Sequence, residues 1–243
     1  MNDKKSFLVL FPGCWGNRTP ELVAWWFRHV INHFNNRYRI VLISYRGKNL
    51  EEYTKCSLNQ LKDIPDGSKA ICYSMGAQIA RAVAQKRPNL FRKVVFISGL
   101  EHFGIRLNIL FAGICIGVIP FLRTLIGQPL KFDTVRQCRN IFFSGKEDDL
   151  SDDSIQKFMD QRIVAEPSRV VLQLSLPFLK RRMKPLSCPI LAIIPKEDFF
   201  LRNVYYTRES VKRVNVPGNH ALLFYNQDRL RKTLDRITLW FEN

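Results

Sequence analysis

The stretch ICYSMGA, residues 71–77, places a lone serine, Ser74, between an apolar run and a segment of helical pattern. The run before it, 68–73, has the length and composition of a buried strand. The segment after it, 76–87, has the spacing of an amphipathic helix. Ser and Gly are common where a strand gives way to a helix, so the serine alone fits either a plain turn or an exposed nucleophile.

The alternation of strand and helix continues along the chain. Runs of strand length recur at 6–11, 39–44, 68–73, 93–98, 189–194 and 210–216. Helical patterns fill the intervals at 20–35, 51–62, 76–87 and 227–241. The first, third and fourth runs are almost unbroken in their apolar residues, as a parallel sheet covered on both faces requires. We therefore expect a doubly wound α/β fold with a mostly parallel sheet of about six strands and helices on both faces.

A long insertion separates the fourth strand from the fifth. It is mostly helical in pattern and carries no strand alternation. We expect residues 1–100 and 188–243 to form the core, and residues 101–187 to form a helical cap on top of the sheet. A chain of 243 residues without an internal repeat or Gly/Ser linker suits this single-domain organisation.

The charge balance is strongly basic. The chain has 38 Lys and Arg against 21 Asp and Glu, a formal charge of +17, so its surface should attract nucleic acid, anionic lipid or an acidic protein. Nucleic acid is the least favoured partner, because the sequence has no recognised binding motif and no basic stripe interleaved with aromatic residues. Peripheral contact with a membrane stays open as an alternative.

Neither a targeting signal nor a cofactor site is indicated. The apolar run before Pro12 is shorter than the apolar region of a secretory signal. The longest apolar stretch, 109–122, is shorter than the ~20 residues that span a bilayer. The six cysteines form no C-x-x-C pair and have no histidine at metal-ligand spacing. We expect a cytoplasmic protein with reduced, mostly buried cysteines and with no metal or organic cofactor.

Ser74 has the setting of a nucleophile elbow. It follows the third strand, and Gly76 two positions later lets the next helix pack closely. Cys72 occupies the position where a second glycine is usual. A serine hydroxyl needs a base that is itself held by a third group, so an acid and a histidine should lie at the ends of later strands.

Two later loops supply these groups. The fifth strand ends in a turn with Glu197 and Asp198, and His220 lies in the loop after the sixth. The carboxyl ends of parallel strands share one edge of a sheet, so these loops should meet Ser74 in one crevice. The order serine, acid, histidine along the chain is also the one that this architecture uses.

Six motifs in order resemble those of the α/β-hydrolase superfamily, over nearly the whole chain. They are FPGCWGN (11–17), SYRG (44–47), CYSMG (72–76), RKVVFISGL (92–100), CPILAIIPKED (188–198) and VPGNHALLF (216–224). The chain departs from the family at Pro12, where His is common, and at Ser44, where many relatives have Asp. Its first strand begins close to residue 1, which implies a compact version without the two strands that usually come first.

The resemblance implies a set of site residues. Ser74 would be the nucleophile, His220 the general base, and Asp198 the group that fixes the imidazole tautomer, with Glu197 as a rival acid. The oxyanion would be held by the backbone N–H groups of Met75 and Cys14. Trp15 is the alternative to Cys14 if the loop is offset by one residue.

These residues predict a serine carboxylic-ester hydrolase that works through an acyl-enzyme. Serine at the elbow argues against dehalogenase and epoxide-hydrolase chemistry, which this family performs with a carboxylate nucleophile. A thioesterase or acyltransferase could use the same triad, and a non-catalytic interaction protein is a further alternative.

The apolar content of the cap suggests an acyl chain as the substrate, since such chains are recognised through buried apolar area. The apolar cap residues are Leu107, Leu110, Phe111, Ile114, Ile116, Val118 and Phe121. The substrate contacts that we expect are Trp15, Leu110, Phe111 and Phe121.

In layout the chain is similar to the pimeloyl-carrier-protein methyl ester esterases of biotin synthesis. Their basic cap residues would correspond here to Arg181 and Arg182, facing an acidic acyl carrier protein. A solvated basic surface with no partner is the plainer reading of the same residues.

Overall fold

The computed structural model describes residues 5–99, 117–143, 150–175, 186–198, 211–224 and 227–243. Its centre is a six-stranded sheet in the order β2-β1-β3-β4-β5-β6, in which every neighbouring pair is parallel. The strands are β1 (Phe7–Phe11), β2 (Arg39–Leu42), β3 (Ser68–Tyr73), β4 (Phe91–Ile97), β5 (Ile190–Pro195) and β6 (Val211–Val216). All of them lie where the apolar runs of the sequence predict.

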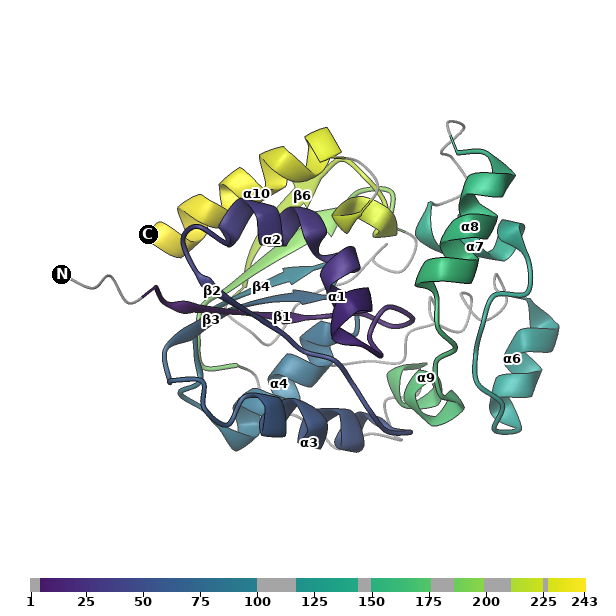
Figure 1. Ribbon diagram of the computed structural model, residues 1–243, viewed down its shortest axis with the longest axis horizontal. Coiled ribbons are helices and arrows are strands. Elements are labelled where there is room, and N and C mark those ends of the chain that lie inside the picture. The colour runs from purple at the N-terminus through teal and green to yellow at the C-terminus, as the bar shows by residue number, and fades with distance from the viewer. Residues whose placement is uncertain (1–4, 100–116, 144–149, 176–185, 199–210, 225–226) are drawn as a thin grey trace.

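Helices cover both faces of the sheet, which confirms the expected doubly wound fold. Figure 1 shows α1 (Pro20–Trp26), α2 (Arg28–Phe34) and α10 (Gln227–Glu242) on one face. The other face carries α3 (Leu50–Gln60) and α4 (Gly76–Lys86). The apolar runs of β1, β3 and β4 are buried between these layers, as strands covered on both sides should be.

The expected single helix over 20–35 is wrong in one respect, because it is divided at Phe27. Thr19 caps the first helix by accepting a hydrogen bond from the Leu22 N–H, and Pro20 follows at the first helical position. Phe27 leaves helical geometry, with φ −99° and ψ 11°. It is fully buried, as is its neighbour Trp26. The break lets both large side chains enter the core, which the helical periodicity alone does not reveal.

The chain between β4 and β5 is helical in most of its described part. It contains α6 (Val118–Leu125), α7 (Val135–Phe142), α8 (Asp152–Arg162) and α9 (Ser168–Ser175). One short extended contact, an antiparallel bridge between Leu130 and Glu166, joins two of its loops. Figure 1 shows these helices beside the carboxyl ends of the strands, and both chain termini at the opposite end of the molecule.

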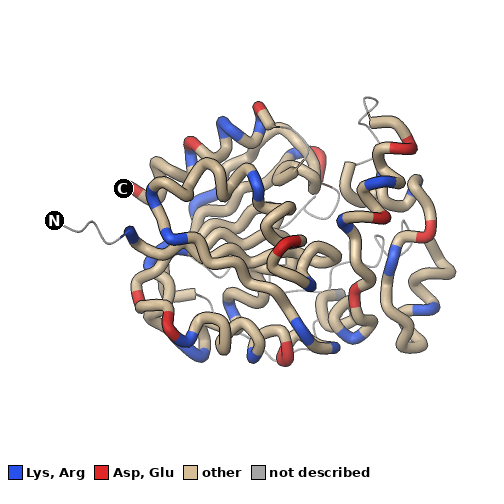
Figure 2. The backbone as a smooth tube through the Cα atoms, viewed as in Figure 1, with Lys and Arg blue, Asp and Glu red and all other residues tan. Residues whose placement is uncertain are grey.

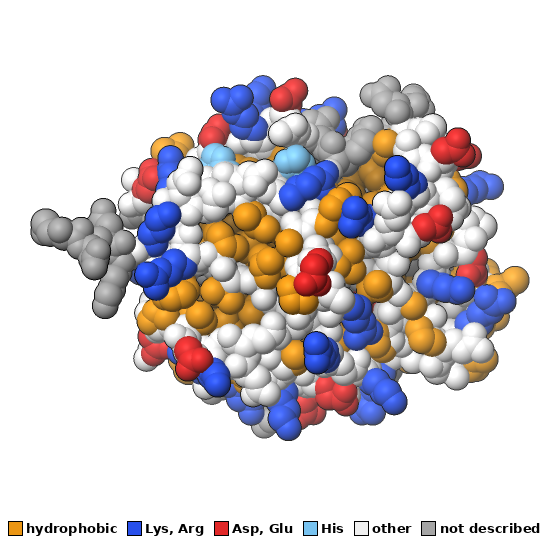
Figure 3. Space-filling model, in the orientation of Figure 1, with side chains coloured by type: hydrophobic (Ala, Val, Ile, Leu, Met, Phe, Trp, Pro, Cys, Tyr) orange, Lys and Arg blue, Asp and Glu red, His pale blue; other side chains and the backbone are white. Residues whose placement is uncertain are grey.

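Charged side chains are spread over the surface. Figure 2 shows Lys and Arg on the helices of both layers and on the segment between β4 and β5, and Figure 3 shows them interspersed with apolar and acidic side chains on the visible face. Arg181 and Arg182 lie outside the described residues. Among the helices that are described, none has the length and apolar character needed to cross a bilayer.

Candidate active site

Ser74 lies at the turn between β3 and α4, in a strained backbone conformation. Its φ is +49°, in the left-handed region that residues other than glycine rarely adopt. The Ser74 N–H donates to the Ile97 carbonyl of β4 at 3.0 Å, so the turn is tied to the neighbouring strand. Met75 follows as the N-cap residue of α4. A strained serine raised at the end of a buried strand is the geometry of a nucleophile elbow.

Two glycines allow the chain to pass close to this turn. A Cβ atom at Gly76 would lie 2.3 Å from the Phe11 carbonyl oxygen, which leaves room for hydrogen only. A Cβ atom at Gly13 would lie 3.0 Å from the Cβ atom of Ser74. The loop after β1 therefore runs directly against the serine, as the sequence motifs predict.

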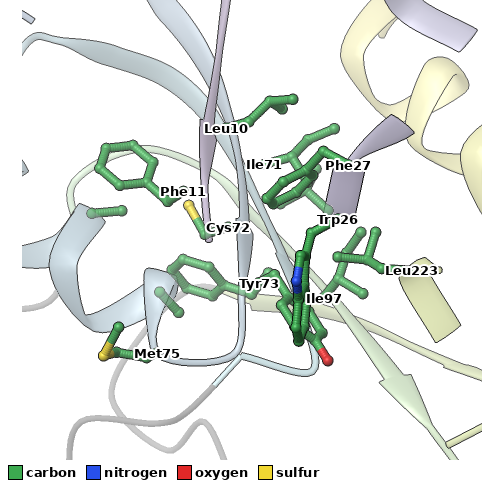
Figure 4. Close-up of a cluster of buried hydrophobic side chains, with 14 of the residues drawn as sticks. Leu10, Phe11, Trp26, Phe27, Ile71, Cys72, Tyr73, Met75, Ile97 and Leu223 are labelled. Atoms are coloured by element: carbon green, nitrogen blue, oxygen red, sulfur yellow. The ribbon is translucent and has the colours of Figure 1, made fainter. Parts of the chain in front are cut away.

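Cys72 occupies the elbow position where glycine is usual. It is fully buried in β3, in register with Phe11 of β1 and Phe96 of β4. Figure 4 shows it within the cluster of buried apolar side chains under the turn. The thiol thus fills part of the core here.

His220 and Asp198 form a buried pair. The imidazole Nδ1 lies 2.8 Å from Asp198 Oδ2, and the exposed fractions of the two side chains are 2% and 0%. Asp198 follows β5, and His220 begins the 3₁₀ helix η3 (His220–Leu223) after β6. Strand ends that are distant in the sequence bring an acid and an imidazole into direct contact.

Glu197, the rival acid, has another partner. Its carboxylate accepts a hydrogen bond from the Gly218 N–H, and its own N–H donates to the Gly218 carbonyl at 2.9 Å. Gly218 has a φ of +125°. Glu197 thus fastens the loop that carries His220, while Asp198 faces the imidazole.

Tyr73 places His220 beside the serine turn. The Tyr73 hydroxyl donates to the His220 carbonyl at 2.6 Å, and the two rings lie with centroids 5.2 Å apart. Tyr73 directly precedes Ser74, so the backbone of His220 is anchored to the residue next to the expected nucleophile, and its ring packs against the same residue. Burial raises the pKa of the Tyr73 hydroxyl, with a further contribution from the nearby Asp198 carboxylate, which keeps Tyr73 protonated as a donor.

The two expected oxyanion donors of the loop after β1 differ in their contacts. The Trp15 N–H donates to the buried Glu166 carboxylate at 3.0 Å. The Cys14 side chain contacts Met75, with the two sulfur atoms 3.5 Å apart. Cys14 therefore lies against the first residue after Ser74, and the Trp15 amide already serves another acceptor.

An aromatic cluster connects this loop to the histidine. The centroid of the Trp15 ring lies 4.9 Å from that of Phe132 and 5.7 Å from that of Phe142. The Phe142 and His220 ring centroids are 5.8 Å apart. Phe132 and Phe142 belong to the segment between β4 and β5, and the sequence does not predict them at the site. The capping-box pattern of Thr134 and Gln137 could have predicted where α7 begins. It could not have predicted that Phe142, at the end of the helix, contacts His220.

The described part of the structure does not place the other three expected substrate contacts, Leu110, Phe111 and Phe121, in the aromatic cluster. Leu110 and Phe111 lie outside the described residues. Phe121 is partly buried on α6. Much of the apolar surface of α6 faces outward, since Val118 is 59% and Ile119 64% exposed. Of the expected residues, the structure brings Trp15 into the aromatic cluster near His220.

Cysteine chemistry is disfavoured at this site. Burial raises the pKa of the Cys14 and Cys72 thiols, and it raises that of Cys138 to about 12. A thiol with a raised pKa carries little thiolate at neutral pH and is a poor nucleophile. Ser74 remains the better candidate in this part of the molecule.

Comparison with protein-family models and with curated proteins gives no match. Many solved structures are similar in fold. An extracellular α/β-hydrolase from a Paenibacillus species has a TM-score of 0.62 and 13% identity, covering 94% of this chain and 97% of that one. A thermophilic esterase from Thermogutta terrifontis has a TM-score of 0.63 and 12% identity, covering 98% and 90%. An epoxide hydrolase from Bacillus megaterium has a TM-score of 0.63 and 13% identity, covering 98% and 93%.

Proposed function

We propose that this chain, which has the α/β-hydrolase fold, is a serine hydrolase that cleaves carboxylic esters through an acyl-enzyme. One observation carries the proposal. The buried pair of Asp198 and His220, 2.8 Å apart, is anchored through Tyr73 to the strained turn that carries Ser74. Nucleophile, base and orienting acid therefore gather at one edge of the sheet, as acyl-transfer catalysis requires.

Each group has a role in the reaction. The Ser74 Oγ attacks the acyl carbonyl and forms a C–O bond, while His220 Nε2 takes the hydroxyl proton. Asp198 accepts from Nδ1–H and so holds the tautomer that leaves Nε2 able to accept. The Met75 and Cys14 amides bind the tetrahedral oxyanion, which collapses and expels the alcohol with the proton from His220. Water then attacks the acyl-enzyme while His220 takes its proton. The second tetrahedral intermediate collapses, Ser74 leaves with the proton from His220, and the acid is released.

The nucleophile also separates this chain from some proteins of the same fold. A carboxylate at the elbow would favour attack on an epoxide or a carbon–halogen bond, whereas Ser74 favours attack on a carbonyl. Similarity to an epoxide hydrolase in backbone geometry does not carry its chemistry over, because function resides in the site.

The aromatic cluster favours an apolar acyl group as the substrate. Trp15, in the loop after β1, packs against Phe132 and Phe142, and Phe142 packs against the His220 ring. Such a chain gains free energy in proportion to the apolar area that it buries.

A series of p-nitrophenyl esters of increasing acyl length tests this function. We expect kcat/KM to rise by up to about fourfold per added methylene until the acyl chain is longer than the apolar surface that binds it, from about 0.8 kcal/mol per CH₂. The Ser74→Ala variant gives the background rate. A lack of turnover at every length would contradict ester hydrolysis, and a rate that does not change with acyl length would contradict an apolar acyl group as the substrate.

A finer proposal is that the acyl group arrives on an acidic acyl carrier protein, as a methyl ester of the pimeloyl-carrier type. The formal charge of +17 supports it, because a basic surface accelerates encounter with an acidic partner. Arg181 and Arg182 are the residues that we expect to meet the carrier.

Charge reversal at Arg181 and Arg182 to Glu should lower kcat/KM for a carrier-linked ester by about tenfold at low salt and less at high salt, because salt screens the steering. Turnover of a free p-nitrophenyl ester should be unchanged. The matched control reverses Lys62, in the turn after α3, and Lys86, the last residue of α4, both of which are exposed. Equal losses on carrier-linked and free substrates would contradict the carrier proposal.

A further inference from the structure

Glu166, a cap residue between α8 and α9, lies fully buried against the core with an exposed fraction of 0%. Its Oε2 atom accepts from the Trp15 N–H at 3.0 Å and from Asn17 Nδ2 at 2.9 Å. Its Oε1 atom accepts from the Tyr53 hydroxyl at 2.5 Å, a short charge-assisted bond. Two of these donors belong to the loop after β1, and the third belongs to α3.

The contacts of Asn17 connect this carboxylate to the Cys14 amide. Asn17 Nδ2 also donates to the Gly13 carbonyl at 3.0 Å. The described chain has no cis peptide bond, and in a trans peptide the C=O and the following N–H point in opposite directions. Holding the Gly13 carbonyl on Asn17 therefore turns the Cys14 N–H toward the other side of the loop.

The peptide plane on the other side of Cys14 is fixed as well. Its N–H belongs to Trp15 and is held by Glu166. Trp15 has a φ of +66°, a conformation that needs support from its surroundings. Both peptide planes that flank Cys14 thus depend on hydrogen bonds that lead to one buried carboxylate.

The cap holds the remaining polar groups of Trp15. Its carbonyl accepts from the Val164 N–H at 2.8 Å, and its indole Nε1 donates to the Leu130 carbonyl at 3.4 Å. Leu130 and Glu166 are themselves joined by two backbone hydrogen bonds of 2.8 and 2.9 Å. The loop after β1 is therefore clamped by a short extended pair of cap segments.

A buried carboxylate is an expensive way to join two parts of a protein, because its charge loses water. Burial raises the pKa of Glu166, while hydrogen bonds from Tyr53, Trp15 and Asn17 oppose part of the rise. Apolar packing could have joined cap and core without this cost. A carboxylate gives what apolar packing cannot, namely a fixed direction for the loop donors.

We propose that Glu166 is a positioning residue that sets the Cys14 amide of the oxyanion hole through Asn17 and Trp15, and so couples the cap to the reaction centre. This inference rests on the proposed ester hydrolysis. It also gives the cap a role in the chemical step, beyond enclosing the acyl chain.

The test compares Glu166→Ala and Glu166→Gln with the wild type, using kcat and KM for a p-nitrophenyl ester. The inhibition constant of an alkyl trifluoromethyl ketone, which forms a tetrahedral adduct on a reactive serine, reports oxyanion binding. We expect Glu166→Ala to lower kcat by about 10- to 100-fold, because the loss of a whole oxyanion donor costs about 10²–10³-fold. Its KM should stay within about threefold, since the amide acts on the transition state.

The ketone should bind to Glu166→Ala more weakly by the same factor as the loss in kcat/KM. Glu166→Gln should stay within about threefold on every measure, because its amide oxygen can accept from Trp15 and Asn17 and the Tyr53 hydroxyl can turn to accept. Glu51→Ala, an exposed glutamate on α3, is the matched control.

Two results would overturn the inference while leaving ester hydrolysis intact. One is a folded Glu166→Ala protein with wild-type kcat, and the other is a loss of kcat with unchanged ketone affinity. If Glu166→Ala does not fold, Asn17→Ala tests the same coupling, because it leaves two donors on Glu166; full kcat there would also overturn it. Absence of turnover in the wild type would instead contradict the proposed function itself.

Discussion

Replacing Ser74 with alanine should lower kcat/KM for the preferred p-nitrophenyl ester by about 10⁴-fold or more, because no acyl-enzyme forms without the hydroxyl. The substitution removes one oxygen atom from a side chain that is 7% exposed, so the fold should persist. Steady-state kinetics, with circular dichroism as the check on folding, measures the effect. Wild-type turnover by the alanine variant would place the nucleophile elsewhere.

A second substitution at the same position separates catalysis from stability. Ser74 holds a φ of +49°, and a residue with a Cβ atom loses roughly 1–2 kcal/mol in this region. Glycine avoids that loss, although it has more backbone entropy to lose on folding. We expect Ser74→Gly to be as inactive as Ser74→Ala but at least as stable in urea unfolding as the wild type. A lower stability for the glycine variant would contradict a strained turn.

Asp198→Asn should lower kcat by about 10³- to 10⁴-fold, an effect of the size known for the equivalent change in serine proteases. The asparagine amide would donate to Nδ1 of His220, so the proton would reside on Nε2, the nitrogen that must accept from Ser74. The pair is buried, and water cannot easily replace the lost interaction. Kinetics across a pH series, on protein shown to be folded, measures the loss.

Glu197→Gln is the matched control, since it makes the same chemical change at the adjacent residue. Glu197 accepts from the Gly218 N–H, and a glutamine oxygen can accept the same bond. We expect kcat within about threefold of the wild type, because the loop that carries His220 keeps its place. Losses of similar size in the two variants would contradict the assignment of Asp198 as the orienting acid.

The sequence predicted the elements whose pattern is local. The apolar runs located all six strands, and the order of serine, acid and histidine located three loops that the structure places at one sheet edge. The elbow pattern predicts that Gly76 allows close packing, and a Cβ atom there would overlap the Phe11 carbonyl. These features depend on period, turn chemistry and chain order, which a single sequence records.

The features that the sequence did not predict depend on contacts between distant segments. In the sequence Glu166 is an ordinary charged residue, and only the structure shows that Asn17 and Tyr53, each more than a hundred residues away along the chain, bind it. Nothing in the sequence around Phe142 indicates that its ring contacts His220. The division of the first helix at Phe27 likewise follows from packing, because helical spacing fits a straight helix equally well.

We propose that Ser74 is an activated hydroxyl served by His220 and Asp198. Incubation of the folded protein with a fluorophosphonate, followed by digestion and mass spectrometry, tests it most directly. We expect one adduct per chain, on the peptide that contains Ser74, and much slower labelling in His220→Ala. A folded protein that stays unlabelled, or that carries the adduct on another residue, would contradict it.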